Sequence, residues 1–342
     1  MIGSDRQHTL NAALSFEGIG LHTGEHATLT IEPGEPNTGY VFVRVDLDEN
    51  PEIPALAGNV SETRRGTTLA ANNATVHTTE HVLAALYANG VDNARLLLHG
   101  GEVPILDGSS LPFVEGIVQA GTKEQDAPRK FFKVRRNIAH RDEYGCEMLL
   151  VPSDEDGFKL TVMVDYNSPI LGTQHARLEG LSRFNESIAS CRTFVFLKEV
   201  ATLAEQGLIK GGDIDNAVVL AEREYSPEEL NAIAKAVGRS ELNEPAQTPG
   251  MLNPSSLRFP NEPARHKLLD IVGDLALTGR FIQGHVLAAR PGHSNNVAFA
   301  KLLQQQISAQ ENLPDFRTDR PSLLDINDIT NLLPHRYPFL LV

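Results

Sequence analysis

The sequence is short of several features that define whole classes of protein. Its two cysteines, Cys146 and Cys191, are too few for a disulfide framework, so we expect a reducing compartment. It has no run of about 18 apolar residues and no apolar segment near its start, so we expect neither a membrane span nor an export signal. Basic residues number 30 against 44 acidic ones, and the net charge of −14 argues against duplex nucleic acid as a partner. These absences predict a cytoplasmic protein.

What the sequence does have is length and histidine. Its 342 residues predict two domains and the beginning of a third, at roughly 150 residues per domain. The apolar share of 41% is enough for a sizeable core. The 12 histidines are a large stock of candidate metal ligands and proton carriers.

Short strands recur in a pattern that suggests an internal duplication. Pro33 and Pro152 lie 119 residues apart, and Asp46 and Asp165 are separated by the same 119 residues. The alternative is chance similarity between two strand–turn–strand patterns. The predicted strands span residues 13–19, 26–32, 40–47, 146–152 and 159–166.

Two amphipathic helices are predicted, one in each half of the chain. Each helix ends near a glycine that can terminate it, Gly90 in the first half and Gly279 in the second. His81 and Asp270 each lie nine residues before that glycine, so the two side chains can meet if the halves pack face to face. The two predicted helices span residues 79–88 and 264–277.

Four later stretches complete the organisation. Residues 222–262 are polar and proline-containing, and predict a long surface excursion. Residues 301–312 are typical of an exposed helix, and residues 313–323 of a linker. Residues 324–342 read as the start of a further domain.

A histidine and two aspartates form the first candidate site. His266 and Asp270 are four residues apart, which places them on one face of a helix, and Asp274 continues that face. Imidazole nitrogen and carboxylate oxygen together can bind Zn²⁺. Such a pair is more often solvated or satisfied locally, so the spacing alone is weak.

The segment from His77 to His81 matches H-x-x-E-H, the inverted zinc-protease signature. A protease would use both histidines as ligands from one continuous helix. If Thr78 or Thr79 is the N-cap, however, His77 precedes the helix and only His81 can be a ligand, with Glu80 beside it as base. A third interpretation is a plain helix start with an acidic first turn. The spacing leaves all three open.

Two further segments hold candidate residues. His293 lies in a glycine-flanked loop after an apolar strand, where an imidazolium can protonate a leaving amine. A surface histidine is the commoner case. In the strand near Thr193, alternation places Phe194 and Phe196 on one face and Thr193 on the other, as in an ordinary edge strand with core phenylalanines.

Together these segments closely resemble the LpxC family of zinc-dependent UDP-3-O-acyl-N-acetylglucosamine deacetylases of lipid A biosynthesis. Six motifs in the family's order are far more specific than any one of them. The resemblance covers roughly residues 7–305. The motifs are GIGLHTG at 18–24, TTEHVLAAL at 78–86, EVPILDGSS at 102–110, CRTFVF at 191–196, RHKLLDIVGDL at 265–275 and GHSNN at 292–296.

The resemblance implies a zinc site and two proton-transferring residues. His81, His266 and Asp270 would be the zinc ligands, with Fe²⁺ as an alternative metal. Glu80 would be the general base that removes a proton from the zinc-bound water. His293 would be the protonated general acid for the departing amine.

The remaining implied roles concern orientation and substrate binding. Asp274 would orient His293, and Thr193 would hydrogen-bond the oxyanion. Lys267 would meet polar groups of the nucleotide-sugar, and Phe194 and Phe196 would contact it as well. The family's inserted β-α-β unit matches residues 197–219, lines a passage for the acyl chain, and contains the further substrate-binding residues Leu197 and Gly212.

The resemblance also implies the architecture: an α+β protein made of two duplicated α/β sandwich domains, with the active site between them. The tail LLPHRYPFLLV resembles the opening of the β-hydroxyacyl-acyl-carrier-protein dehydratases, so we expect a truncated fusion without dehydratase activity. The expected parts are deacetylase domain I at 1–127, domain II with the insert at 128–305, a linker at 306–323 and the dehydratase-like fragment at 324–342.

The expected partner is therefore a UDP-linked acylated aminosugar. The deacetylase part is expected to be monomeric, and the whole fusion to oligomerise through the dehydratase. Two other functions stay open at this point. An inverted-motif protease would need His77 for zinc, and a non-enzymatic scaffold would bind no metal.

Overall fold

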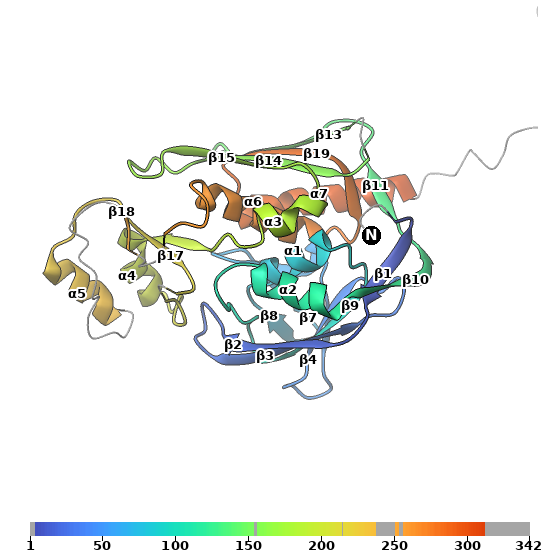
Figure 1. The fold of residues 1–342 in the computed structure, drawn as a ribbon, viewed down its shortest axis with the longest axis horizontal. Coiled ribbons are helices and arrows are strands. Elements are labelled where there is room, and N and C mark those ends of the chain that lie inside the picture. Colours follow the sequence, from blue (N-terminus) through green and yellow to red (C-terminus); the bar gives the residue numbers. More distant parts are fainter. Residues whose placement is uncertain (1–3, 154–155, 214, 237–249, 253–255, 312–342) are drawn as a thin grey trace, which may run out of the picture. The chain divides into compact units, whose positions relative to one another are not determined.

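The computed structural model describes residues 4–153, 156–213, 215–236, 250–252 and 256–311, and shows a mixed α+β protein with several sheets (Figure 1). Its contacts divide the chain into Met1–Gln304 and Gln305–Val342. The first unit holds both main sheets and all the candidate site residues. The expected dehydratase-like fragment at 324–342 and most of the expected linker lie outside the described residues.

The two main sheets have the same strand order and the same strand directions. In the five-strand path of each, the third and fourth strands are parallel and the other neighbouring pairs are antiparallel; β11, at the side of the second sheet, also pairs in parallel with β19. The first sheet consists of β2 (Leu14–Ile19), β3 (His26–Pro33), β9 (Ala94–His99), β4 (Tyr40–Arg44) and β5 (Glu52–Pro54). The second consists of β12 (Ile138–Arg141), β13 (Glu147–Val151), β19 (Phe281–Ala289), β14 (Phe158–Asp165) and β15 (Thr173–Leu178), and β11 (Phe131–Lys133) also pairs with β19.

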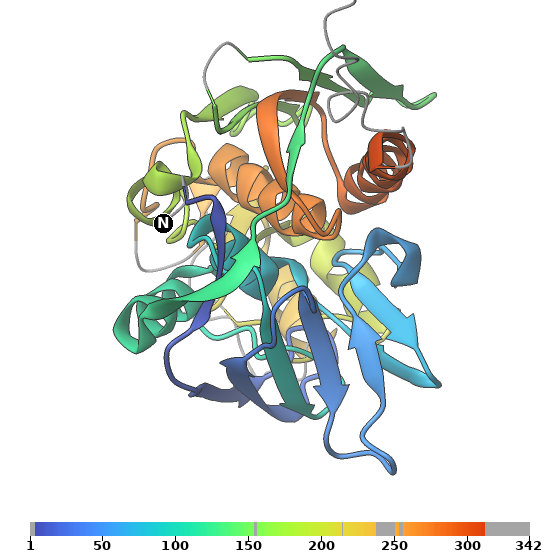
Figure 2. The same cartoon turned by 90° about the vertical axis from the view of Figure 1, so that its right-hand side faces the viewer.

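Two helices pack against each other between these sheets, α1 (Glu80–Ala88) and α6 (Glu262–Ala276) (Figures 1 and 2). Every residue of α1 is buried, because the helix contacts protein on all sides. Gly273 permits the close approach, since a Cβ there would lie 2.1 Å from the Glu80 carbonyl oxygen. This packing places the parts of α6 on either side of Gly273 next to the N-terminal end of α1.

The remaining elements surround this core. Helices α2 (Leu111–Ala120) and α3 (Phe184–Ser187) and the 3₁₀ turns η1 (Ala57–Asn59) and η2 (Leu181–Arg183) are short, whereas α7 is long (His293–Glu311). Strands β1 (Arg6–Leu10) and β10 (Thr122–Pro128) form a ribbon, and β6 (Val60–Glu62), β7 (Thr68–Ala71) and β8 (Ala74–Val76) form a small sheet. The largest fully buried side chains include Phe42, Phe113, Phe158, Phe184 and Phe299.

A separate module follows residue 193. Strands β16 (Phe194–Phe196) and β17 (Val218–Ala221) are parallel and joined by α4 (Leu197–Glu205), which is a β-α-β unit. Helix α5 (Pro227–Ala236) packs on α4, and β18 (Gly250–Met251) pairs with β17. The stretch expected to be a surface excursion, 222–262, contains helix α5 in its described part, and the buried face of α5 packs on α4 while much of the rest is exposed. Residues 237–249 and 253–255 of that stretch lie outside the described residues.

Two other expectations need correction. Helix α7 begins at His293, so this histidine is the first residue of a helix and not a loop residue. The helix expected at 301–312 is the second part of α7. It is not exposed all round, because Leu303 and Ile307 are buried.

Candidate metal centre and active site

The start of α1 places His81 in the interior and leaves His77 outside the helix. Thr79 occupies the predicted N-cap position, but its hydroxyl donates to the carbonyl of Thr67 and does not cap a helix N–H. His77 precedes it, and its Nδ1 lies 3.0 Å from the Thr68 hydroxyl. The two histidines of the H-x-x-E-H match are therefore not on one continuous helix.

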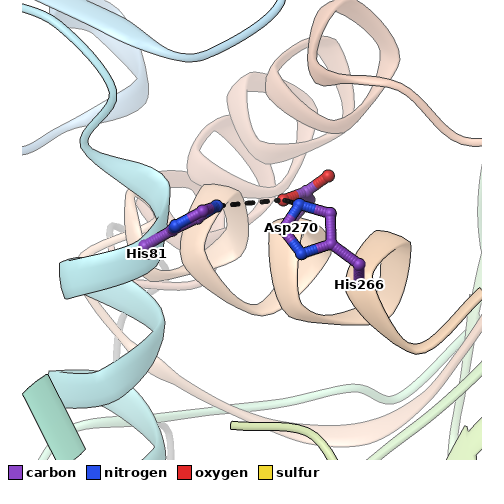
Figure 3. A group of neighbouring side chains, drawn as sticks. All are labelled: His81, His266 and Asp270. Atoms are coloured by element: carbon purple, nitrogen blue, oxygen red, sulfur yellow. Dashed lines mark ion pairs between the residues drawn. The ribbon is translucent and has the colours of Figure 1, made fainter. Parts of the chain in front are cut away.

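On α6, His266 and Asp270 face His81 (Figure 3). His266 donates from Nδ1 to the Cys191 carbonyl at 3.1 Å, which leaves its Nε2 with a free lone pair 3.3 Å from Asp270 Oδ1. His81 Nε2 lies 3.9 Å from the same oxygen. One potential ligand atom from each residue lies within 4.8 Å of the other two.

These three residues fit a divalent metal ion. All are buried, and Asp270 Oδ1 has no hydrogen-bond partner within the described structure. Burial and the neighbouring His266 lower the pKa of His81 to about 3, so its ring is neutral and able to bind metal. For Asp270, burial raises the pKa, but the neighbouring histidines and Lys267 outweigh it and the carboxylate stays ionised. Burial lowers the pKa of His266, so its ring is also neutral. Two neutral imidazoles and a carboxylate are ligands typical of zinc and iron sites.

A carboxylate and an imidazole flank this group. Glu80 Oε1 lies 3.7 Å from His293 Nε2, and the same nitrogen lies 3.7 Å from Asp270 Oδ2. Burial, with repulsion from Asp274 and Asp270, raises the pKa of Glu80 to about 7. Burial and the N-terminus of α7 both disfavour a charged His293, but the acidic residues around it outweigh them and raise its pKa to about 9. Both pKa values are raised, and between them the carboxylate of Glu80 is ionised while the neighbouring ring of His293 is protonated.

Asp274 and Thr67 hold these two groups. Asp274 Oδ2 lies 3.0 Å from His293 Nδ1 and accepts a hydrogen bond from Asn296. Thr67 donates its hydroxyl to Asp274 Oδ1 at 2.5 Å and its backbone N–H to Glu80 Oε2 at 3.0 Å. Sequence reasoning missed Thr67, because no spacing rule links it to a residue 207 positions away.

A cavity of about 510 Å³ opens on these residues. Thr193, Phe194 and Lys267 line it close to the triad, and Lys267 is paired with Asp270 at 2.8 Å. The expected substrate residues Leu197 and Gly212 are on its wall too. Phe196 is not among its lining residues. Its ring is buried in the cluster with Val218 and Leu220.

Tyr166 is a second residue that sequence reasoning missed. Its ring packs edge-on against Phe194 and Phe196, with centroid distances of 5.3 and 5.8 Å. Its hydroxyl is buried without a hydrogen-bond partner within the described structure. The available signal was an aromatic residue directly after the strand that ends at Asp165.

A mixed α+β fold with a buried two-histidine, one-aspartate group beside a carboxylate and a protonated histidine is typical of metal-dependent hydrolases. The model of one family, LpxC, the UDP-3-O-acyl N-acetylglycosamine deacetylases, matches residues 7–237 and 245–305. The chain belongs to this family, as its motifs predicted.

Curated relatives agree with the family match. The chain is 46% identical over 340 residues to the bifunctional enzyme LpxC/FabZ of Chlorobaculum tepidum, which covers 98% of this chain and 72% of that protein. It is 45% identical to the enzyme of the same name from Bacteroides thetaiotaomicron, with 98% and 73% covered. The UDP-3-O-acyl-N-acetylglucosamine deacetylase of Myxococcus xanthus is 37% identical over 317 residues, with 92% of both chains covered.

Within the described part of the chain, the helices are too short or too polar to cross a lipid bilayer.

Proposed function

We propose that this chain hydrolyses the acetamide of UDP-3-O-acyl-N-acetylglucosamine, a step of lipid A biosynthesis, and releases acetate and the free amine. His81, His266 and Asp270 would hold Zn²⁺, or Fe²⁺ in its place. The observation that carries the proposal is the buried triad, whose Asp270 Oδ1 has no partner within the described structure, next to the carboxylate of Glu80 and the imidazole of His293. The names of the relatives support the substrate.

Zinc bound at the triad would act as a Lewis acid that lowers the pKa of water and polarises the amide carbonyl. Glu80 takes a proton from the attacking water at Oε1, and the water oxygen bonds to the acetamide carbonyl carbon. The carbon–nitrogen bond then breaks as His293 gives the proton on Nε2 to the departing nitrogen. The raised pKa values of both residues favour these roles, because an acid must stay protonated near neutral pH and a base must bind the proton it accepts.

Three neighbours would orient the reaction. Asp274 holds Nδ1 of His293, so that Nε2 points toward Glu80. Thr193 would donate its hydroxyl to the developing oxyanion, and its backbone is fixed by hydrogen bonds to Gly108 and Val218. Lys267 would leave part of its pairing with Asp270 for polar groups of the nucleotide-sugar. Phe194 would contact it from the cavity wall, and the buried ring of Phe196 would support Phe194 edge-on and not touch the substrate itself.

The two sheets of identical order support the proposal that the deacetylase is a duplication, with domain I at 1–127, domain II at 128–305 and the active site between them. Each half then contributes one helix, α1 or α6, to the triad. The linker at 306–323 and the dehydratase-like fragment at 324–342 are proposed by analogy with the bifunctional relatives. A cytoplasmic location stays a prediction, with Cys146 and Cys191 as free buried thiols.

The test is the metal content and deacetylase activity of Asp270→Ala. We expect the purified wild-type protein to carry about one metal ion per chain and the variant to lose it, with activity reduced by at least ~100-fold, since even residues behind the ligands are worth about 10–100-fold. Full zinc occupancy with undiminished hydrolysis would reject the ligand assignment.

His77→Ala is the matched control. Its side chain bonds Thr68 and lies outside the triad, so the variant should keep both metal and activity. Loss of zinc in His77→Ala would favour the inverted-motif protease instead. A wild-type protein without any metal would favour the scaffold.

A further inference from the structure

The cavity at the triad extends into an apolar region built by the module after residue 193. Most of its apolar lining residues belong to, or pack against, a buried cluster formed by α4, β17 and α5. This region is chemically distinct from the end that holds Glu80, His81 and Asp270. The lining residues of this cluster include Val195, Leu197, Val200, Val219, Ile233 and Leu252.

Two of these residues come from outside the β-α-β unit. Ile233 lies on α5, and Leu252 directly follows β18, so both belong to the stretch at 222–262, where the family resemblance assigns no site residue. Both positions lie inside the residues that the family model matches, 7–237 and 245–305, but outside the six motifs that carry the resemblance. The motifs therefore say nothing about this part of the wall.

The structure holds both residues firmly in place. On α5, Leu230, Ile233 and Ala234 are buried against the module. Leu252 donates its backbone N–H to the Val219 carbonyl at 2.9 Å, which continues the pairing of β18 with β17. Both side chains are thus fixed parts of the cavity wall, and Leu230 supports α5 without lining the cavity.

Helix α5 packs on α4, and α4 lies between α5 and the pair α1 and α6 in Figure 1. Ile233, and Leu252 which packs against the same buried cluster, therefore belong to the part of the wall that this module builds, whereas the triad lies on α1 and α6. We propose that Ile233 and Leu252 form an end wall that limits the length of the acyl chain this enzyme accepts. This inference rests on the proposed function, because it assumes an acylated substrate whose acetamide lies at the triad.

The expected behaviour follows from the burial of methylene groups. Each additional methylene that enters the apolar region should raise kcat/KM roughly fourfold, until the chain reaches the wall. Beyond that length the gain should stop or reverse, because a rigid wall forces the chain to bend or remain in water. The limiting length is therefore a measurable property of the wall.

The experiment measures kcat and KM of the full chain, loaded with metal, on substrates whose acyl chains lengthen two carbons at a time. Ile233→Ala should move the limiting length to longer chains, and Ile233→Phe to shorter ones. The change should appear mainly in KM, since the wall is remote from the reacting bond. Leu252→Ala and Leu252→Phe should shift the limit in the same two directions, and they provide a second test if an Ile233 variant does not fold.

Leu230→Ala is the matched control, because it removes a buried side chain from the same helix but not from the cavity wall. It should lower the thermal midpoint and leave the limiting length unchanged. Shifts in the Ile233 and Leu252 variants alone support the end wall. A limiting length that is unmoved in all folded wall variants, or moved equally by Leu230→Ala, overturns it while the deacetylase function stands. A wild-type protein that deacetylates no chain length would instead refute the proposed function.

Discussion

Two buried groups of charged residues differ in how well their polar atoms are satisfied. Glu262, on the first turn of α6, accepts hydrogen bonds from the backbone and side chain of Arg192 and from the backbone of Arg258, so both its oxygens are paired. About two turns further along the same helix lies Asp270 of the triad, and its Oδ1, like Nδ1 of His81 on α1, has no partner in the described structure.

The difference separates residues that stabilise the fold from residues kept for chemistry. An unpaired buried polar atom costs about 1–3 kcal/mol, so a fold that retains two of them at one place has them available for something else. Glu262 holds the chain near residue 192 against α6, which also places Cys191 to accept from His266. The hydrogen-bonded pair of Arg192 and Glu262 thus supports the triad.

The largest expected effect comes from Glu80→Gln. This variant tests whether the buried charged residues at the triad serve activity and not stability. We expect kcat to fall by about 10²–10⁴-fold, the usual contribution of a general base. The pH–rate profile should lose its acidic limb, because the raised pKa of Glu80 makes the wild type lose its base as the pH falls through that value. The basic limb should persist, since His293 still loses its proton as the pH rises.

His293→Ala supplies the reciprocal control: it should remove the basic limb and keep the acidic one. Glu80→Gln should not lower the free energy of unfolding, because burial and the neighbouring carboxylates disfavour the charge on Glu80. His293→Ala should lower it, because the acidic residues around His293 stabilise its charged form and the variant leaves Asp274 buried without this partner. Identical pH profiles in the wild type and both variants would contradict the assigned roles.

A smaller effect, on stability alone, is expected for Glu262→Gln. Breaking a buried pair that leaves Arg192 uncompensated should cost about 3–5 kcal/mol of unfolding free energy. Burial raises the pKa of Glu262, but the hydrogen bonds from Arg192 outweigh it and the pKa is lowered overall. The wild-type contribution is therefore present above the ordinary carboxyl pKa and is lost as the pH falls through the lower folded value.

Urea titrations of both proteins between pH 7 and pH 3, about the range where carboxyls titrate, measure this. The difference between the wild type and Glu262→Gln should shrink as the pH falls. Metal bound per folded molecule should not change. Glu262→Gln could instead be as stable as the wild type, or fold normally but lose its metal. Either result would show that the Arg192–Glu262 pair and the triad do not have separate roles.

Local structure in this chain follows from residue patterns, whereas the site depends on contacts that the patterns do not encode. The helices at 79–88 and 264–277 were predicted within two residues of α1 and α6, because their apolar spacing is set by burial against each other. The pattern could not show whether His81 pairs with His77 or with Asp270, since that depends on the close approach at Gly273. The family motifs, not the spacing, favoured Asp270.

The same limit explains the misplaced elements. Pro291 and Gly292 predict a loop, but α7 begins directly after them because Asp274 holds His293 and Asn296. The polar, proline-containing composition of 222–262 concealed α5, whose buried residues Leu230, Ile233 and Ala234 share one face. Burial of a short amphipathic helix against a neighbour is a tertiary effect that composition does not reveal.

The smallest effect is expected where a charged pair is neither buried nor unsatisfied. Arg141 and Glu147 face each other across β12 and β13 at 2.6 Å, with 71% and 54% of their side chains exposed. Arg141→Ala should change the unfolding free energy by less than about 1 kcal/mol, because water screens an exposed pair and holding two long side chains costs entropy. Urea titration at low and high salt measures it, and salt should reduce even this difference. A loss comparable to that of Glu262→Gln would mean that short distance alone sets the worth of an ion pair in this protein. Burial and the satisfaction of polar atoms would then no longer separate its structural charges from its chemical ones.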